Sequence, residues 1–144
     1  MRECVFCGVS IERGDYIVGG DEFSVAFLDK NPAAPGHVLV IPRRHVERLD
    51  ELSEEELKKY FVFISKVEKA VLEFAGAGGG CDIVNHYRPF LKESEMVKKH
   101  LHFHVIPRKL NDSVFKGERI HLSESEMKRV ASSISEILER VLKF

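Results

Sequence analysis

The residues best suited to chemistry are three histidines, His100, His102 and His104, which alternate with apolar residues. Successive side chains of a β-strand point to opposite faces of a sheet, so a strand places the three imidazoles on one face and the apolar side chains on the other. Imidazole titrates near neutral pH and serves as a nucleophile, a general base or a metal ligand. The pattern therefore predicts a functional site on one face of a strand.

Length and composition limit the kind of protein that carries this site. The chain has 144 residues, of which 44% are hydrophobic, so we expect a single domain over residues 1–144. The formal net charge is -1, which gives no electrostatic reason to expect nucleic acid or an anionic membrane as a partner. No apolar run approaches the length of a bilayer span, and Met1 is followed by Arg-Glu-Cys. We expect a cytoplasmic protein.

The hydrophobic pattern predicts five short strands and two long helices. Strand-length runs rich in branched residues lie at 16–18, 23–28, 37–41, 81–85 and 101–106. Ser53 with Glu56, and Ser123 with Glu126, are capping boxes that predict the starts of the helices. The early strands follow one another too closely for helical crossovers, so the sequence predicts an α+β fold with a mainly antiparallel sheet.

Helical spacing of apolar residues indicates which faces of the two helices pack on the sheet. In the first helix these positions are Leu57, Phe61, Ile64, Val67 and Val71. In the second they are Val130, Ile134, Ile137 and Val141. We expect the first helix to end at the glycine-rich segment 76–80.

The segment from His100 to Ile106 has the form His-φ-His-φ-His-φ-φ, where φ is apolar, and resembles the signature of the histidine triad (HIT) family of nucleotide hydrolases and transferases. Other parts of the chain recur in family order and spacing: Cys4-x-x-Cys7, 25–29, 35–42, His45, Asn85 and Pro107-Arg108. The resemblance implies a HIT-like fold and a homodimer. In that homodimer the first helix and a sheet edge join two copies into one continuous sheet.

The resemblance gives the histidines separate roles. His102 corresponds to the nucleophile that forms a covalent nucleotidyl-histidine intermediate, and its central position between two imidazoles also favours this role. His104 corresponds to the histidine that contacts the phosphate, and His37 to the one that supports the triad. Without the resemblance, His37 is more simply read as a structural histidine at the start of a strand. No catalytic metal is expected.

The nucleotide site is inferred mainly from the resemblance. Phe6, Val9 and Phe27 align with residues that line the base pocket, Asp29 with the carboxylate that binds the ribose, and Asn85 with a phosphate-contacting asparagine. Taken singly, Phe6 and Phe27 are more simply core residues, and an asparagine after a strand is common in turns.

The cysteines suggest a second, structural site. Cys4 and Cys7 have the spacing of a zinc-binding pair but provide only half of a tetrahedral site. The resemblance to the family branch with an N-terminal Cys-x-x-Cys implies that His45 and His100 complete a structural zinc site. A redox pair or two ordinary thiols are the alternatives. We interpret Cys81 as a buried strand residue.

One segment departs from the family pattern. The family usually has a glycine-rich loop ending in Gly-Gln-Ser/Thr before its triad, whereas residues 86–99 contain no glycine and have Met96 and Val97 at the corresponding place. Arg88 and the lysines at 98–99 are positive charges that can compensate, or they simply balance nearby glutamates.

Three functions follow from these observations. The first is an enzyme that hydrolyses or transfers the nucleoside monophosphate group, most simply a purine one, of a phosphoramidate or a dinucleoside polyphosphate. The second is a nucleotide-binding interaction protein with little turnover. The third is a metal-dependent enzyme in which His100, His102 and His104 bind a catalytic ion.

Overall fold

The computed structural model describes Cys4 and residues 6–7, 16–92 and 100–143. Its elements, in chain order, are β1 (Ile17–Gly20), β2 (Ser24–Leu28), β3 (Val38–Pro42), η1 (Leu49–Glu51), α2 (Glu54–Ala75), β4 (Gly80–Val84), β5 (Phe103–Arg108), η2 (Val114–Lys116) and α4 (Glu124–Leu142). Val9 and residues 93–99 lie outside this description. None of the helices described is both long enough and apolar enough to cross a bilayer.

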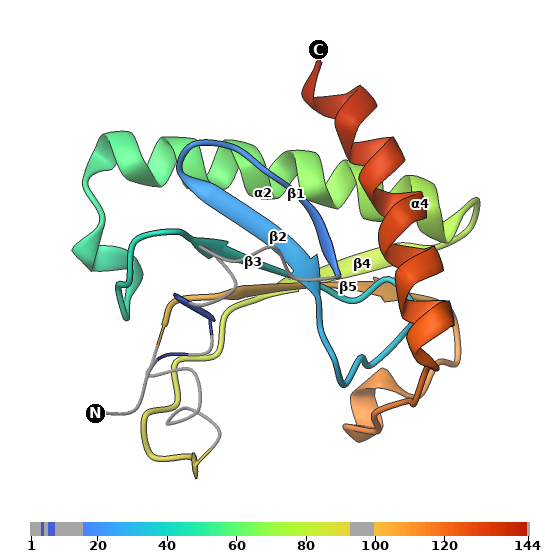
Figure 1. Cartoon of the computed structure of the whole chain (residues 1–144). Helices are drawn as coiled ribbons and strands as arrows, with labels where there is room; N and C mark the ends of the chain where they lie inside the picture. The colour runs from blue at the N-terminus through green and yellow to red at the C-terminus, as the bar shows by residue number, and fades with distance from the viewer. Residues whose placement is uncertain (1–3, 5, 8–15, 93–99, 144) are drawn as a thin grey trace.

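The five strands form one antiparallel sheet in the order β1-β2-β3-β5-β4 (Figure 1). Pairing continues across the sheet from Phe27 to Leu39, His104 and Val84, so these four side chains form one row. The predicted α+β fold, with a five-stranded antiparallel sheet and two long helices, is confirmed.

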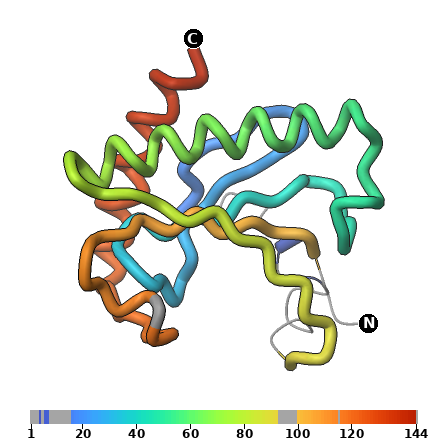
Figure 2. Tube along the Cα trace, turned by 180° about the vertical axis from the view of Figure 1, so that it is seen from behind, coloured from blue at the N-terminus to red at the C-terminus, as the bar shows by residue number. Residues whose placement is uncertain are grey.

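The sheet is buried on both faces over its central strands. Helices α2 and α4 cover one face (Figure 1), and the view from behind shows α2 running across the sheet (Figure 2). The main core between the helices and the sheet includes Val38, Val40, Leu101, Phe103 and Val105. A smaller cluster on the other face contains Cys4, Phe6, Val25, Phe27, Leu39 and Ile41. Because Leu101, Phe103 and Val105 face the helices, the alternate residues His102 and His104 face the smaller cluster.

Both helices begin where the capping boxes predict. Ser53 and Ser123 are the N-caps, and in each case the side chain accepts a hydrogen bond from the backbone N–H of the glutamate three residues later. Helix α2 ends at Gly76, whose φ of +86° is favourable only for glycine.

Some burial predictions are wrong at the rims of these elements. Phe61 is 41% exposed. Ile137 and Val141 are only partly buried, and Ala131 and Leu138 take their place in the core. Cys81 is half-buried, because the edge strand β4 has a neighbour on one side only among the residues described. Spacing identifies the centre of a buried stripe better than its edges.

The strand that carries the triad begins later than predicted, at Phe103, so His100 and His102 precede it. Hydrogen bonds outside the sheet ladder hold this stretch. The backbone N–H of Leu101 donates to the carbonyl of Val46 (2.7 Å), and the ring of His100 donates from Nε2 to the carbonyl of Pro42 (2.8 Å). One backbone bond and one side-chain bond to residues outside the ladder thus hold the functional end of this segment.

Candidate functional site

Cys4, Cys7, His45 and His100 form a compact group of metal-binding side chains. Their potential ligand atoms all lie within 4.8 Å of one another. The Sγ of Cys7 is 3.2 Å from Nδ1 of His45 and 3.5 Å from Nδ1 of His100, and the Sγ of Cys4 is also 3.5 Å from Nδ1 of His100. Ligands of a tetrahedral zinc ion lie about 3.3–3.8 Å apart. The two thiols and two imidazoles therefore fit a Cys2His2 site.

The environment of this group also fits a cation. His100 uses its Nε2–H to bond the Pro42 carbonyl, so a neutral ring presents the lone pair of Nδ1 to the thiols. Burial and the neighbouring Cys4 raise the pKa of Cys7 to about 11. Two adjacent thiols do not ionise together readily, whereas a divalent cation binds them as thiolates.

His102 has its tautomer fixed by the backbone. Its Nδ1 lies 2.9 Å from the carbonyl oxygen of His100, and because a carbonyl can only accept, Nδ1 carries the proton. Burial lowers the pKa of His102, so the ring is neutral at pH 7. The Nε2 atom of a neutral ring then has a free lone pair, as a nucleophile needs.

A chain of hydrogen bonds fixes His104 in the tautomer opposite to that of His102. The backbone N–H of Ala33 donates to Nδ1 of His37 (3.0 Å), so neutral His37 carries its proton on Nε2. That Nε2–H donates to Nδ1 of His104, 2.9 Å away. Burial lowers the pKa of both rings, to about 4 for His37, so neutral His104 carries its proton on Nε2. His102 thus offers a lone pair, and His104, with its ring 5.1 Å away, offers an N–H.

The predicted base and ribose residues lie on the β2 side of the histidines. The rings of Phe6 and Phe27 pack edge to face at 5.4 Å, and Phe6 lies 5.2 Å from the ring of His102. Asp29 follows β2; its Oδ1 accepts from the N–H of Asn31 (2.8 Å), and its Oδ2 is 3.5 Å from Nε2 of His37. Asn85 directly follows β4 and is half-buried.

The three triad histidines do not form one metal-binding group. His100 belongs to the cysteine group, and His104 belongs with His37 and Asp29. In the second group the ring nitrogens of His37 and His104 bond each other. The arrangement of the described residues therefore argues against a catalytic metal held by all three.

Two residues near the site were missed as site residues by sequence reasoning. The ring of His86 lies 5.3 Å from that of His104. Arg119, between η2 and α4, donates from Nη1 to the carbonyl of Asn31 (2.7 Å) and lies 3.4 Å from Oδ2 of Asp29. His86 is an isolated loop residue and Arg119 is distant in sequence, so no spacing identifies either.

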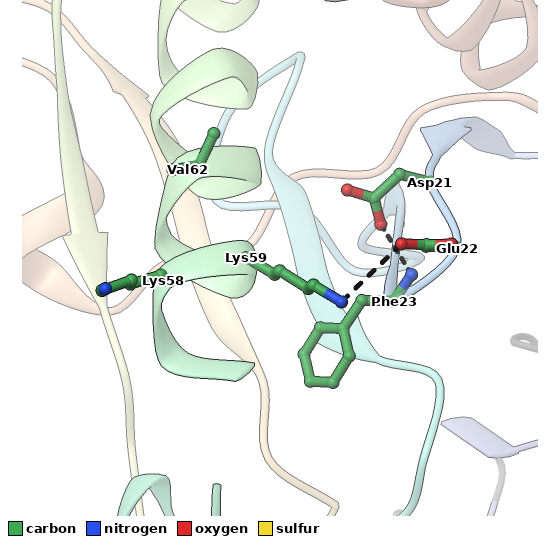
Figure 3. Close-up of a pocket in the computed structure, with 6 residues that line it drawn as sticks. All are labelled: Asp21, Glu22, Phe23, Lys58, Lys59 and Val62. Carbon is green, nitrogen blue, oxygen red and sulfur yellow. Dashed lines mark hydrogen bonds and ion pairs between the residues drawn. The ribbon is translucent and has the colours of Figure 1, made fainter. Parts of the chain in front are cut away.

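A separate hollow lies near the start of α2 and the β1–β2 turn (Figure 3). It is lined by Asp21, Glu22, Phe23, Lys58, Lys59 and Val62. Lys59 and Glu22 form an ion pair across it at 3.7 Å. None of the predicted site residues lines this hollow.

Comparison with known proteins agrees with this geometry. The profile of the HIT domain matches residues 11–111. The chain belongs to the HIT domain family. It is 34% identical over 140 residues to a HIT-like protein of Methanocaldococcus jannaschii, covering 96% of this chain and 98% of that protein.

This HIT protein is also similar to a named nucleotide hydrolase and to a HIT protein of known structure. It is 32% identical over 108 residues to the adenosine 5'-monophosphoramidase of Schizosaccharomyces pombe, covering 73% of this chain and 74% of that enzyme. A Hit-like protein from Bartonella henselae has the same fold, with a TM-score of 0.77 and 27% identity over 94% of this chain and 96% of that one. The family thus includes nucleotide hydrolases among its named members.

The burial of neutral His37 predicts a pH-dependent stability. The pKa of His37 is about 4 in the folded protein and about 6.5 when unfolded, so the unfolded chain binds more protons between these values. We expect the free energy of unfolding to fall as pH falls from about 6.5 to about 4. We expect His37→Gln to reduce that fall by roughly 2–3 kcal/mol, measured by urea unfolding at several pH values.

The exposed histidine outside the site provides the control for this measurement. His121→Gln should leave the pH dependence of wild type unchanged, and loss at low pH of any metal held by the cysteine group would affect all three proteins alike. Parallel curves for wild type and His37→Gln would contradict the assignment of a buried neutral His37.

Proposed function

We propose that this HIT protein is a nucleotide hydrolase or nucleotidyl transferase that uses His102 as a nucleophile. Its substrate is a purine nucleoside phosphoramidate or a dinucleoside polyphosphate. The hydrogen bond from Nδ1 of His102 to the carbonyl of His100 carries this proposal, because it leaves Nε2 free to attack. The similarity to the fission-yeast monophosphoramidase supports the substrate class.

The proposed reaction has two displacement steps at phosphorus. In the first, Nε2 of His102 forms a bond to phosphorus, while the bond to the leaving group breaks and its electron pair leaves with that group, which takes up a proton. In the second, water or another acceptor attacks phosphorus, loses a proton, and releases Nε2. The Nε2–H of His104 stabilises a phosphoryl oxygen in both steps, and His37 positions His104 through the 2.9 Å hydrogen bond.

The remaining nucleotide contacts follow from the layout of the sheet. We propose that Phe6, Phe27 and Val9 contact the base, that Asp29 accepts hydrogen bonds from the ribose hydroxyls, and that Asn85 contacts the phosphate. The edge-to-face pair of Phe6 and Phe27 beside His102 supports the first of these assignments.

A structural zinc ion is the second part of the proposal, held by Cys4, Cys7, His45 and His100. The distances among their ligand atoms support it. When bound, zinc would hold the N-terminal segment against the triad and would not take part in the reaction. The side chain of His100 would then be committed to the metal, while its backbone carbonyl holds His102.

A homodimer is the third part. Strand β4 is an edge strand of the described sheet, and exposed apolar side chains lie on it and on α2, the helix that packs against it: Ile83, Phe61 and Leu72. An unpaired edge with apolar neighbours favours pairing with another chain. We propose that two copies join through β4 and α2 into one continuous sheet.

Replacing the nucleophile should abolish turnover. We expect His102→Ala to lower the rate on a fluorogenic adenylate phosphoramidate by about 10⁴-fold or more, while AMP binding stays within about threefold of wild type. His121→Ala is the matched control and should keep wild-type turnover. Equal turnover by His102→Ala and wild type would rule out this nucleophile.

Removing one thiol should remove the metal. Elemental analysis of protein produced with zinc should give one zinc ion per wild-type chain and less than one tenth of that in Cys4→Ser, with a lower unfolding temperature. Cys81→Ser, outside the metal group, should retain the zinc. A wild-type protein without zinc after zinc-supplemented production would overturn the site.

A charge at the proposed dimer edge should separate the subunits. We expect wild type to sediment as a dimer and Ile83→Lys as a monomer at micromolar concentration, because the charge would be buried in the interface. Val62→Lys, at an exposed position of α2 that lines the hollow near the β1–β2 turn, is the control. A monomeric wild-type protein would contradict the proposed interface.

A further inference from the structure

Six of the seven histidines gather around the two sites, and His86 is the one to which no role has yet been assigned. It lies on the same face of the sheet as the triad. Val84 pairs with His104 in the antiparallel register of β4 and β5, and His86 follows Val84 by two residues. If that register is continued, position 86 falls opposite position 102.

The ring contacts agree with this placement. The ring of His104 lies 5.1 Å from that of His102 and 5.3 Å from that of His86, at interplanar angles of 69° and 59°. His86 is an exposed residue, so a ligand can reach it. The three imidazoles thus form a continuous surface that extends from the nucleophile toward β4.

The strand order shows which part of a substrate would reach His86. Phe27 and Asp29 belong to β2 and the turn after it, on one side of the histidines, whereas His86 follows β4 on the other side. With the nucleoside on the β2 side and phosphorus beside His102 and His104, the leaving group and the phosphoryl oxygen nearest to it lie on the side of β4. This step rests on the proposed function.

We propose that His86 is a substrate-binding residue whose ring N–H donates a hydrogen bond to a phosphoryl oxygen on the leaving-group side of the reaction centre. Neutral imidazole donors suit an anionic phosphate in a partly buried site. Residues 86–92 contain no glycine, so their backbone is less free to approach a phosphate closely, and a side-chain donor takes over this task.

The electrostatic surroundings favour hydrogen bonding over proton transfer. The pKa of His86 is lowered, chiefly by its partial burial. The positive charge of Arg88 and the nearby His102 and Arg119 lower this pKa further. The ring is therefore mainly neutral at pH 7, with one N–H to donate. A glutamine at this position also has an N–H donor but cannot deliver a proton as an acid.

The test compares His86→Ala and His86→Gln on two adenylate substrates, an alkylamine phosphoramidate and a p-nitrophenyl ester. We expect His86→Ala to lower kcat/KM by about 10- to 100-fold on both, because the lost hydrogen bond is to the phosphoryl group. His86→Gln should recover most of the loss. His121→Ala should match wild type, and all variants should unfold at the wild-type temperature.

Three results would separate this inference from its alternatives. If His86→Ala keeps the wild-type kcat/KM while His102→Ala has no turnover, the role of His86 is overturned and the proposed function is not. A loss confined to the alkylamine substrate and not recovered by His86→Gln would overturn hydrogen bonding in favour of proton donation. Full turnover by His102→Ala would instead contradict the proposed function.

Discussion

The hydrogen bond from Nδ1 of His102 to the carbonyl oxygen of His100 is the interaction on which the proposed chemistry depends. Free imidazole exchanges between two tautomers, and only one of them presents a lone pair at Nε2. A carbonyl acceptor two residues earlier selects that tautomer. The same principle operates at His104, where the N–H of Ala33 fixes the proton of His37, and His37 in turn fixes that of His104. Backbone groups thus determine which ring offers a lone pair and which offers a donor.

His100 connects the two sites because its two ring nitrogens and its carbonyl each have a different partner. Its Nε2 donates to the Pro42 carbonyl at the end of β3, its Nδ1 faces the cysteines, and its carbonyl accepts from His102. A metal bound at Cys4 and Cys7 would therefore restrict the backbone that holds the nucleophile. On this account, the N-terminal segment contributes to the precision of the reaction centre although none of its thiols enters the reaction.

The sequence predicts the parts of this arrangement that follow from periodicity and capping. Alternation along the triad separates Leu101, Phe103 and Val105 from His102 and His104, and the sheet has that division of faces. The sequence does not predict that β5 starts only at Phe103, because that boundary depends on hydrogen bonds to Val46 and Pro42, which are distant in sequence. His86 was missed as a site residue for the same reason: its position depends on the register between β4 and β5.

The central claim is that a neutral His102 attacks phosphorus through Nε2, and trapping the intermediate tests it most directly. Rapid mixing with an adenylate phosphoramidate, a neutral quench and peptide mass spectrometry should find AMP attached within 100–106 on His102. Phosphorus NMR of the same adduct should show attachment at Nε2. An adduct on His104 or His37, or rapid turnover by wild type with no histidine adduct under the same quench, would contradict the account.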